Sequence, residues 1–269
     1  MLLTQQFEPY IRTVCAEKNL PLLADKVIKH AKPALRMHTI AIPMYGDFTT
    51  RSRFGGKPAL PESVPWPENE DGFQFDFILQ INLSEIRLSP QAACLPDSGM
   101  LYVFADHRNQ QSLDGGFCQR VVYSIEAELA LRDIPFDYEY EDSKIPERLI
   151  RFSEIMTVYD AHRLQKYCDV DLNDKEVEIH KTYFDCATCD DALHLLLGVQ
   201  THDDHSGAIS GLTGEYVSND QDLQLLFRID WDNDTNTQWM DGGRLYLYIH
   251  PNDLAKRDFS RVSSAYMSY

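Results

Sequence analysis

An acidic loop in the last third of the chain has residue types and spacing that could bind a metal ion. It contains Asp230, Asp232 and Asp234, and a further carboxylate follows at Asp241. Carboxylates at positions 1, 3, 5 and 12 of a loop resemble the oxygen ligands of a calcium loop. Position 6 is Thr235, where such a turn needs Gly, and Asp241 is shorter than the bidentate Glu expected at position 12. Two interpretations stay open: a calcium site, or a hydrogen-bonded loop at a strand end.

A cysteine pair, Cys186 and Cys189, could supply two thiolates to zinc. Tetrahedral zinc needs four ligands, and the others would have to come from scattered residues such as Cys168, His180 and His194. Six cysteines in 269 residues are too few for a disulfide scaffold, and no βαβ pattern accompanies the pair as it does in thioredoxin-like proteins. A zinc site and two ordinary reduced thiols are the alternatives. We predict no cofactor, with calcium or zinc as the exceptions to test.

A polar loop at residues 202–205 places two histidines beside two aspartates. Imidazole next to carboxylate could serve acid–base chemistry, but histidines in a loop have no fixed geometry, and no nucleophile motif lies near them. The chain also lacks the sequence signatures of a phosphate loop, a dinucleotide fold, a nucleophile elbow and a zinc protease. We therefore predict no catalytic residue and favour a protein that is not an enzyme.

The densest acidic run could bind a basic protein. Its carboxylates alternate with tyrosines: Asp137, Tyr138, Glu139, Tyr140, Glu141 and Asp142. Exposed aromatic rings beside carboxylates would favour fast association with a cationic partner. The net charge of -17 disfavours nucleic acids and anionic membranes as partners, because these need a clustered cationic face. We predict a partner-binding surface here, and an excess of acid that only aids solubility is the alternative.

Regular elements must hold these groups in place. Apolar residues at helical spacing predict a helix behind Thr4, and a second short helix is expected at 21–31. Alternation at 35–42 predicts a strand, and one or two helices should lie between residues 160 and 191. Further strands are expected at 73–82, where alternate apolar residues should share one face, and at 100–105, 118–125, 136–141 and 155–159, whereas 193–197 could be strand or helix.

A repeated segment indicates internal duplication. Two pairs of segments align: 77–83 with 225–231, and 97–102 with 241–246. Each copy has an apolar strand, an irregular excursion, a turn with Asp and then Gly, and a second strand. In these structural turns Asp97 and Asp241 can hydrogen-bond the backbone, while Gly99 and Gly243 supply a positive φ. The copies should pack together, because an isolated strand pair is marginal in water.

The patterns together predict an α+β fold: a mostly antiparallel β-sheet built from an internally duplicated strand unit, with N-terminal and connecting helices. We expect a single compact unit over residues 1–269. Its parts are an N-terminal helical lead-in and first strand (1–45), a first repeat (46–135), an acidic connector (136–192) and a second repeat (193–269). The lead-in is positively charged, so the negative charge lies in the repeats and the connector.

An ordered series of motifs resembles the YwqG-like family of bacterial proteins, which is a domain of unknown function. The resemblance rests on residues 52–61, 64–67, 77–83, 95–99, 226–232, 239–246, 253–254 and 258–259. It implies an α+β fold with internal duplication and confers no reaction. The family's Gly-Tyr-Pro segment is replaced by residues 198–200, and Met240 stands where its Trp-Gly-Asp turn has Gly, so no role is carried over to these loops.

No secretory signal or membrane span is visible, so we predict a cytoplasmic protein. Two functions from different classes remain. The favoured one is a non-catalytic binding module that engages a protein partner through its acidic surface, for example an immunity-type inhibitor of a basic toxin. The alternative is a small-molecule or metal-ion binding protein, or an enzyme, with a carboxylate site between the repeats near Asp97, Asp230, Asp232 and Asp241. The sequence does not predict the oligomeric state.

Overall fold

The fold is that of a computed structural model, which describes residues 4–69, 71–107, 119–136, 144–184, 194–199, 208–210, 216–217, 223–239 and 242–267. Its helices are α1 (Thr4–Glu17), α2 (Pro21–His30), α3 (Ala161–Cys168), α4 (Asp174–Tyr183) and α5 (Pro251–Ala255), with short 3₁₀ helices η1 (Leu83–Glu85), η2 (Pro90–Ala92) and η6 (Phe259–Arg261). Its strands are β1 (Lys32–Ile40), β2 (Arg53–Phe54), β3 (Asp76–Asn82), β4 (Met100–Ala105), β5 (Gln119–Ser124), β6 (Arg148–Thr157), β7 (Leu195–Leu196), β8 (Ala208–Ser210), β9 (Tyr216–Val217), β10 (Gln224–Asp230), β11 (Arg244–Ile249) and β12 (Ser263–Met267).

The strands of the described residues form one antiparallel sheet. Their order is β5-β4-β3-β2-β6-β1-β7-β10-β11-β12-β8-β9. The longest pairing joins β1 to β6, from Lys32 opposite Thr157 to Ile40 opposite Leu149. The strand predicted as part of an N-terminal lead-in is therefore central to the sheet, because it pairs with β6 on one side and β7 on the other. The predicted α+β class with an antiparallel sheet is confirmed.

A β-bulge in β3 corrects the predicted burial of that strand. Strict alternation would place every second residue from Phe73 to Ile81 on one face. Instead, the pairing of β3 with β4 shifts between Phe77 and Leu79. Phe75 and Phe77 consequently pack in one apolar cluster, whereas Leu79 and Ile81 pack in another, and Phe73 is exposed. The bulge turns the strand between two cores, so that both of its faces are buried.

Two strand units have the same hydrogen-bonding pattern. In the first, β2, β3 and β4 adjoin, Phe54 pairs with Leu79, and a register shift precedes Leu79. In the second, β7, β10 and β11 adjoin, Leu196 pairs with Phe227, and a register shift precedes Phe227. Strand β5 follows β4, as β12 follows β11. The units differ at this point, because β12 pairs further with β8 whereas β5 ends the sheet.

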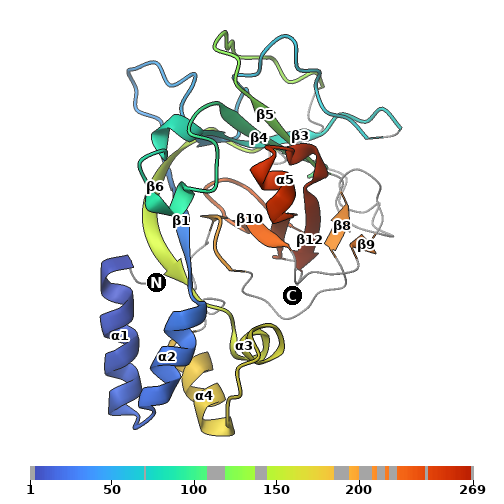
Figure 1. Ribbon diagram of the computed structural model, residues 1–269. Helices are drawn as coiled ribbons and strands as arrows, with labels where there is room; N and C mark the ends of the chain where they lie inside the picture. The colour runs from blue at the N-terminus through green and yellow to red at the C-terminus, as the bar shows by residue number, and fades with distance from the viewer. Residues whose placement is uncertain are drawn as a thin grey trace.

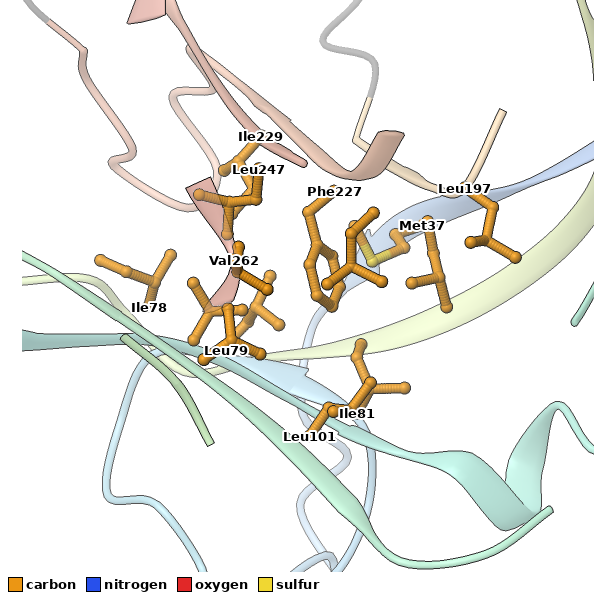
Figure 2. Close-up of a cluster of buried hydrophobic side chains, with 14 of the residues drawn as sticks. Met37, Ile78, Leu79, Ile81, Leu101, Leu197, Phe227, Ile229, Leu247 and Val262 are labelled. Carbon is orange, nitrogen blue, oxygen red and sulfur yellow. The ribbon is translucent and has the colours of Figure 1, made fainter. Parts of the chain in front are cut away.

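The main core lies between the two units. Figure 2 shows Leu79 of β3 facing Phe227 and Ile229 of β10 across this core. Burying a side chain of this size contributes roughly 1.5–3 kcal/mol. The sheet folds back around the core, and Gln119 of β5 donates a hydrogen bond of 2.8 Å to the carbonyl of Val262, just before β12. The first strand in the order, β5, therefore lies against the residue that leads into β12.

Helices α1–α4 form a separate apolar core and lie together at one end of the β1–β6 pair (Figure 1). Phe7, Ile11 and Val14 of α1 are buried in it, as their helical spacing predicts. Helix α4 begins with a capping box, in which the side chains of Asn173 and Glu176 each accept the other's backbone N–H. The predicted N-terminal and connecting helices are confirmed, and no helix within the described ranges is long and apolar enough to cross a membrane.

A buried histidine makes this helical core sensitive to acid. His180 of α4 is fully buried, and neither ring nitrogen has a hydrogen-bond partner among the described residues. Burial lowers the pKa of His180 from 6.5 to about 4. The folded state thus binds this proton more weakly than the unfolded chain does. The stability that neutral His180 provides is complete above pH 6.5 and is lost as the pH falls toward 4.

We expect the variant His180→Leu to gain stability relative to the wild type as the pH is lowered. Between pH 7 and pH 4 the difference in unfolding free energy should change by about 3 kcal/mol, because leucine has no proton to bind. Urea unfolding at a series of pH values measures it. The comparison variant is His162→Leu, which makes the same substitution at an exposed position of α3. A stability difference for His180→Leu that is the same at every pH would contradict the prediction.

The boundaries of several strands differ from those predicted. Strands at 100–105 and 118–125 are confirmed as β4 and β5, and the ambiguous segment 193–197 contains strand β7. Strand β6 begins at Arg148, earlier than predicted, because its pairing with β1 continues through partly exposed residues. The predicted strand at 136–141 lies almost wholly outside the described residues.

Candidate functional site

A groove of about 480 Å³ lies beside the edge strand β5. Its size is within the range of ligand-binding clefts. Three stretches of chain line it: the segment 64–67, residues 120–123 of β5, and the turn 257–260 after α5. These stretches come from opposite ends of the strand order, so the folding of the sheet on itself creates the groove.

The floor of the groove is the edge of β5. Successive residues of a strand point to opposite faces, so a cavity over one face would contact every second residue. Here four consecutive residues line it, from Arg120 to Tyr123. Val122 packs in the cluster that contains Val64, whereas Tyr123 packs against the cluster that contains Phe259. The groove therefore runs along the strand edge, with one wall on each face of the sheet.

The first wall is the proline-containing segment 64–67. Trp66 within it is buried, and its indole donates a hydrogen bond of 2.8 Å to the carbonyl of Phe75. The guanidinium of Arg132 donates to the carbonyl of Val64. Proline has a fixed φ, so little further conformational freedom is lost in holding this segment. The wall is thereby anchored from two sides and presents its prolines to the groove.

The second wall is the turn that ends α5. The N–H of Arg257 donates to the carbonyl of Leu254 at 2.9 Å, and the N–H of Asp258 donates to the carbonyl of Asp253 at 2.8 Å. These are the two bonds of a Schellman motif, whose left-handed position is usually glycine. Arg257 occupies that position with a φ of 61°. A side chain there costs about 1 kcal/mol, so the chain holds a cation beside the groove at the expense of stability.

Arg120, Arg257 and Asp258 line the groove, so its described lining has a net charge of +1 in a chain whose net charge is -17. The Arg120 guanidinium lies 5.8 Å from the centre of the Phe75 ring, which orients it by a cation–π contact. Asp258 accepts hydrogen bonds from the backbone N–H and the hydroxyl of Ser260, both at Oδ1, and keeps its negative charge. Apolar walls with two cations suit a ligand that combines an anionic group with apolar groups.

In the predicted acidic loop, the carboxylate of Asp230 is paired with two arginines. Arg228 donates to its two carboxylate oxygens at 2.6 and 2.7 Å, and Arg244 Nε lies 3.4 Å from one of them. All three side chains are buried. The positive charges offset the carboxylate, so Asp230 serves here as the centre of an internal ion-pair cluster.

Asp232, in the same loop, is hydrogen-bonded to the side chain of His194. His194 Nε2 lies 3.0 Å from Asp232 Oδ2, and its Nδ1 accepts the backbone N–H of Asp230 at 3.2 Å. The ring then donates to Asp232, and neither nitrogen remains for zinc or for acid–base chemistry. Burial disfavours ionisation of Asp232, but hydrogen bonds from His194, the N–H of Asp234 and the hydroxyl of Thr235 outweigh it and lower its pKa. These contacts support the interpretation as a hydrogen-bonded loop.

Several predicted metal ligands are not part of the described residues. Asp241, Cys186 and Cys189 lie outside them, as does the histidine-containing segment 202–205. Asp234 is described and is exposed. Within the described ranges, no group of three or more His, Cys, Asp or Glu is arranged to hold a metal ion. Calcium or zinc binding that uses the other residues stays a prediction.

The acidic run 137–142 also lies outside the described residues, so its interaction with a basic protein stays a prediction. The turn residues can be compared in part. Gly99 has the predicted positive φ, at 98°, and Asp97, two residues before it, is exposed. In the second strand unit the positive φ of 76° belongs to Gly242 and not to Gly243. The two adjacent glycines allow the turn to move by one position there, whereas the first unit has a single glycine at its turn.

Sequence reasoning did not identify the groove. Residues 64–67 and 258–259 belong to the motifs of the family resemblance, so a signal existed, but nothing in the sequence indicated that these segments meet. Arg120 and Arg257 belong to no motif. They converge only because β5 and the turn after α5 are brought together when the sheet folds back on itself.

Most of the chain matches the model of one protein family. The model described as "Domain of unknown function (DUF1963)" matches residues 52–266, which include both strand units and all three stretches that line the groove. A comparison with curated proteins finds no match. The chain therefore belongs to the DUF1963 family.

Proposed function

We propose that this protein is a non-catalytic binding module that uses the groove beside β5 to hold a ligand with an anionic group and apolar groups. The observation that carries the proposal is Arg257, which lines the groove in a conformation that favours glycine. The described lining contains no histidine or cysteine, and the hydroxyl of Ser260 is donated to Asp258. This composition suits binding better than acid–base or nucleophilic catalysis.

We propose in addition that the two strand units are copies of one ancestral unit. Matching backbone bonds support this: Gly55 N–H donates to the carbonyl of Ile78, and Leu197 N–H to that of Leu226, each at 2.9 Å. The alignment of residues 77–83 with 225–231 matches Ile78 with Leu226. The finer resemblance to YwqG-like proteins stays a prediction beside the family membership.

Substituting Arg257 separates the binding role from stability. We expect Arg257→Gly to raise the unfolding free energy by about 1 kcal/mol, because glycine adopts the left-handed conformation without strain. The same change should weaken binding of anilinonaphthalene sulfonate, an anionic aromatic probe, by about fivefold to tenfold, because a charge-assisted contact contributes about 1 kcal/mol or more. Calorimetry measures the affinity, and urea unfolding measures the stability.

The neighbouring variant Lys256→Gly is the matched control. Lys256 is an exposed cation outside the groove with a φ of -85°, so glycine removes a charge without relieving strain. It should lower stability by about 0.5–1 kcal/mol and leave the affinity for the probe unchanged. The proposal fails if the wild type does not bind the probe, or if the two variants alter binding equally.

A further inference from the structure

We propose that the ligand of this groove is an extended acidic peptide, which adds to β5 as an antiparallel strand. The inference rests on the proposed function of the groove and assigns its ligand class. Three observations carry it: the outer edge of β5, with which no described strand pairs, the strand that occupies the corresponding edge in the other unit, and the walls and charges beside β5.

In the described part of the chain no strand pairs with the outer edge of β5, and the side chain of Gln119 at the start of the strand donates to the carbonyl of Val262. Within the described residues, β5 pairs with β4 along its whole length, from Gln119 opposite Ala105 to Ser124 opposite Met100, and it is the first strand in the order. An edge strand directs part of its backbone N–H and C=O groups away from the sheet. The groove runs along this edge, so a ligand in it can reach those groups.

The other unit shows how a strand adds at this position. Val122 lies opposite Tyr102 in β4, and Ala265 lies opposite Tyr246 in β11, so Val122 and Ala265 are equivalent positions. By this register Arg120 and Val121 of β5 correspond to Ser263 and Ser264 of β12. Those two residues pair antiparallel with β8, opposite Ser210 and Ile209 respectively. In the second unit, strand β8 of the same chain therefore occupies the edge of β12. In the first unit, the groove lies at the corresponding edge of β5.

The walls suit a strand with alternating side chains. A peptide paired with Arg120 and Val121 would direct successive side chains to opposite faces of the sheet. One set would meet the prolines of segment 64–67, and the other would meet the wall formed by Phe259. Carboxylates of the peptide can reach the guanidinium of Arg120 on β5 and that of Arg257 on the second wall. A peptide that is apolar in the middle and acidic at both ends satisfies both features.

The experiment uses a blocked peptide of alternating Val and Thr with a Glu at each end. Calorimetry with the full chain should show binding that weakens at least about tenfold when both Glu are replaced by Lys, or when alternate peptide nitrogens are methylated. Methylation removes the backbone donors of the peptide and leaves its side chains in place. Amide exchange of residues 119–124 should slow when the parent peptide is bound.

The outcomes distinguish this inference from the function on which it rests. If the methylated peptide binds as well as the parent, or if residues 119–124 are not protected, strand addition is wrong. If no acidic peptide binds while anilinonaphthalene sulfonate does, the groove is a site for small anions and the peptide is the wrong ligand class. If neither the probe nor the peptide binds, the proposed function of the groove fails with it.

Discussion

Asp230→Asn should lower the free energy of unfolding by about 3 kcal/mol or more. The carboxylate of Asp230 accepts two short bonds from Arg228 and lies 3.4 Å from Arg244 Nε, and all three side chains are buried. Asparagine has nearly the same shape but no charge. The variant therefore leaves two buried guanidiniums close together without the carboxylate that offsets them. Urea or thermal unfolding at neutral pH measures the loss.

Two further variants make this result specific. Asp234→Asn, on an exposed position of the same loop, should change stability by less than about 0.5 kcal/mol. The double variant Arg228→Met with Asp230→Leu should recover at least about 1 kcal/mol relative to Asp230→Asn, since it removes one of the guanidiniums together with the carboxylate. If Asp230→Asn and Asp234→Asn proved equally mild, the ion-pair cluster would have no structural role.

Gly55→Ala is the second substitution with a large expected effect, a loss of about 3 kcal/mol. Gly55 follows β2 with a φ of 55°, which costs an alanine about 1 kcal/mol. A Cβ at this position would lie 2.2 Å from the carbonyl oxygen of Ile145 and 2.5 Å from that of Pro146. Both atoms belong to backbone, so the segment that leads into β6 must shift, and such overpacking costs a further 1–3 kcal/mol, approximately. Chemical unfolding measures the total.

Gly72→Ala is the matched control for the steric part of this effect. Gly72 has a φ of 81°, but a Cβ there would meet no atom within 4 Å. Its substitution should cost about 1 kcal/mol, from the backbone conformation alone. The difference between the two variants then measures the contact with residues 145–146. Equal losses would show that the close approach of the backbone at Gly55 does not constrain the fold.

The expected effects divide the molecule into parts with separate roles. Asp230 and Gly55 stabilise the two strand units, and His180 makes the helical core dependent on pH. Arg257 has the opposite relation to stability, because its substitution by glycine should strengthen the fold and weaken binding. A residue that costs stability and lines a groove is the strongest indication of function in the described structure.

Much of the local structure could be predicted from the sequence. Helical spacing of Phe7, Ile11 and Val14 predicted α1, and the proline at residue 21 marked the start of α2. Alternating or continuous apolar runs predicted β4 and β5 to within a residue or two. These features depend on the spacing of hydrophobic residues along the sequence, and residues close together in the chain determine that spacing. The α+β class followed from the same patterns.

The spacing of possible ligands in a sequence does not show what surrounds each carboxylate in the fold. Asp230 and Asp232 have the spacing of calcium ligands, yet Arg228, Arg244 and His194 reach them from β10, β11 and the residue before β7. Arg228 and Arg244 are ordinary strand residues in the sequence. Their role as counter-ions depends on strand pairing, which brings Arg244 directly opposite Asp230.

The sequence by itself determined the elements, the antiparallel class and the presence of two similar strand segments, since these depend on local periodicity and on self-similarity. Tertiary structure alone decided which faces of β3 are buried, because a single bulge at Ile78 reverses the alternation. Tertiary structure alone also determined the position and the lining of the groove. Arg120 and Arg257 are distant in the chain and belong to no motif, and they share a cavity because burial of the core between the two units brings β5 against the turn after α5.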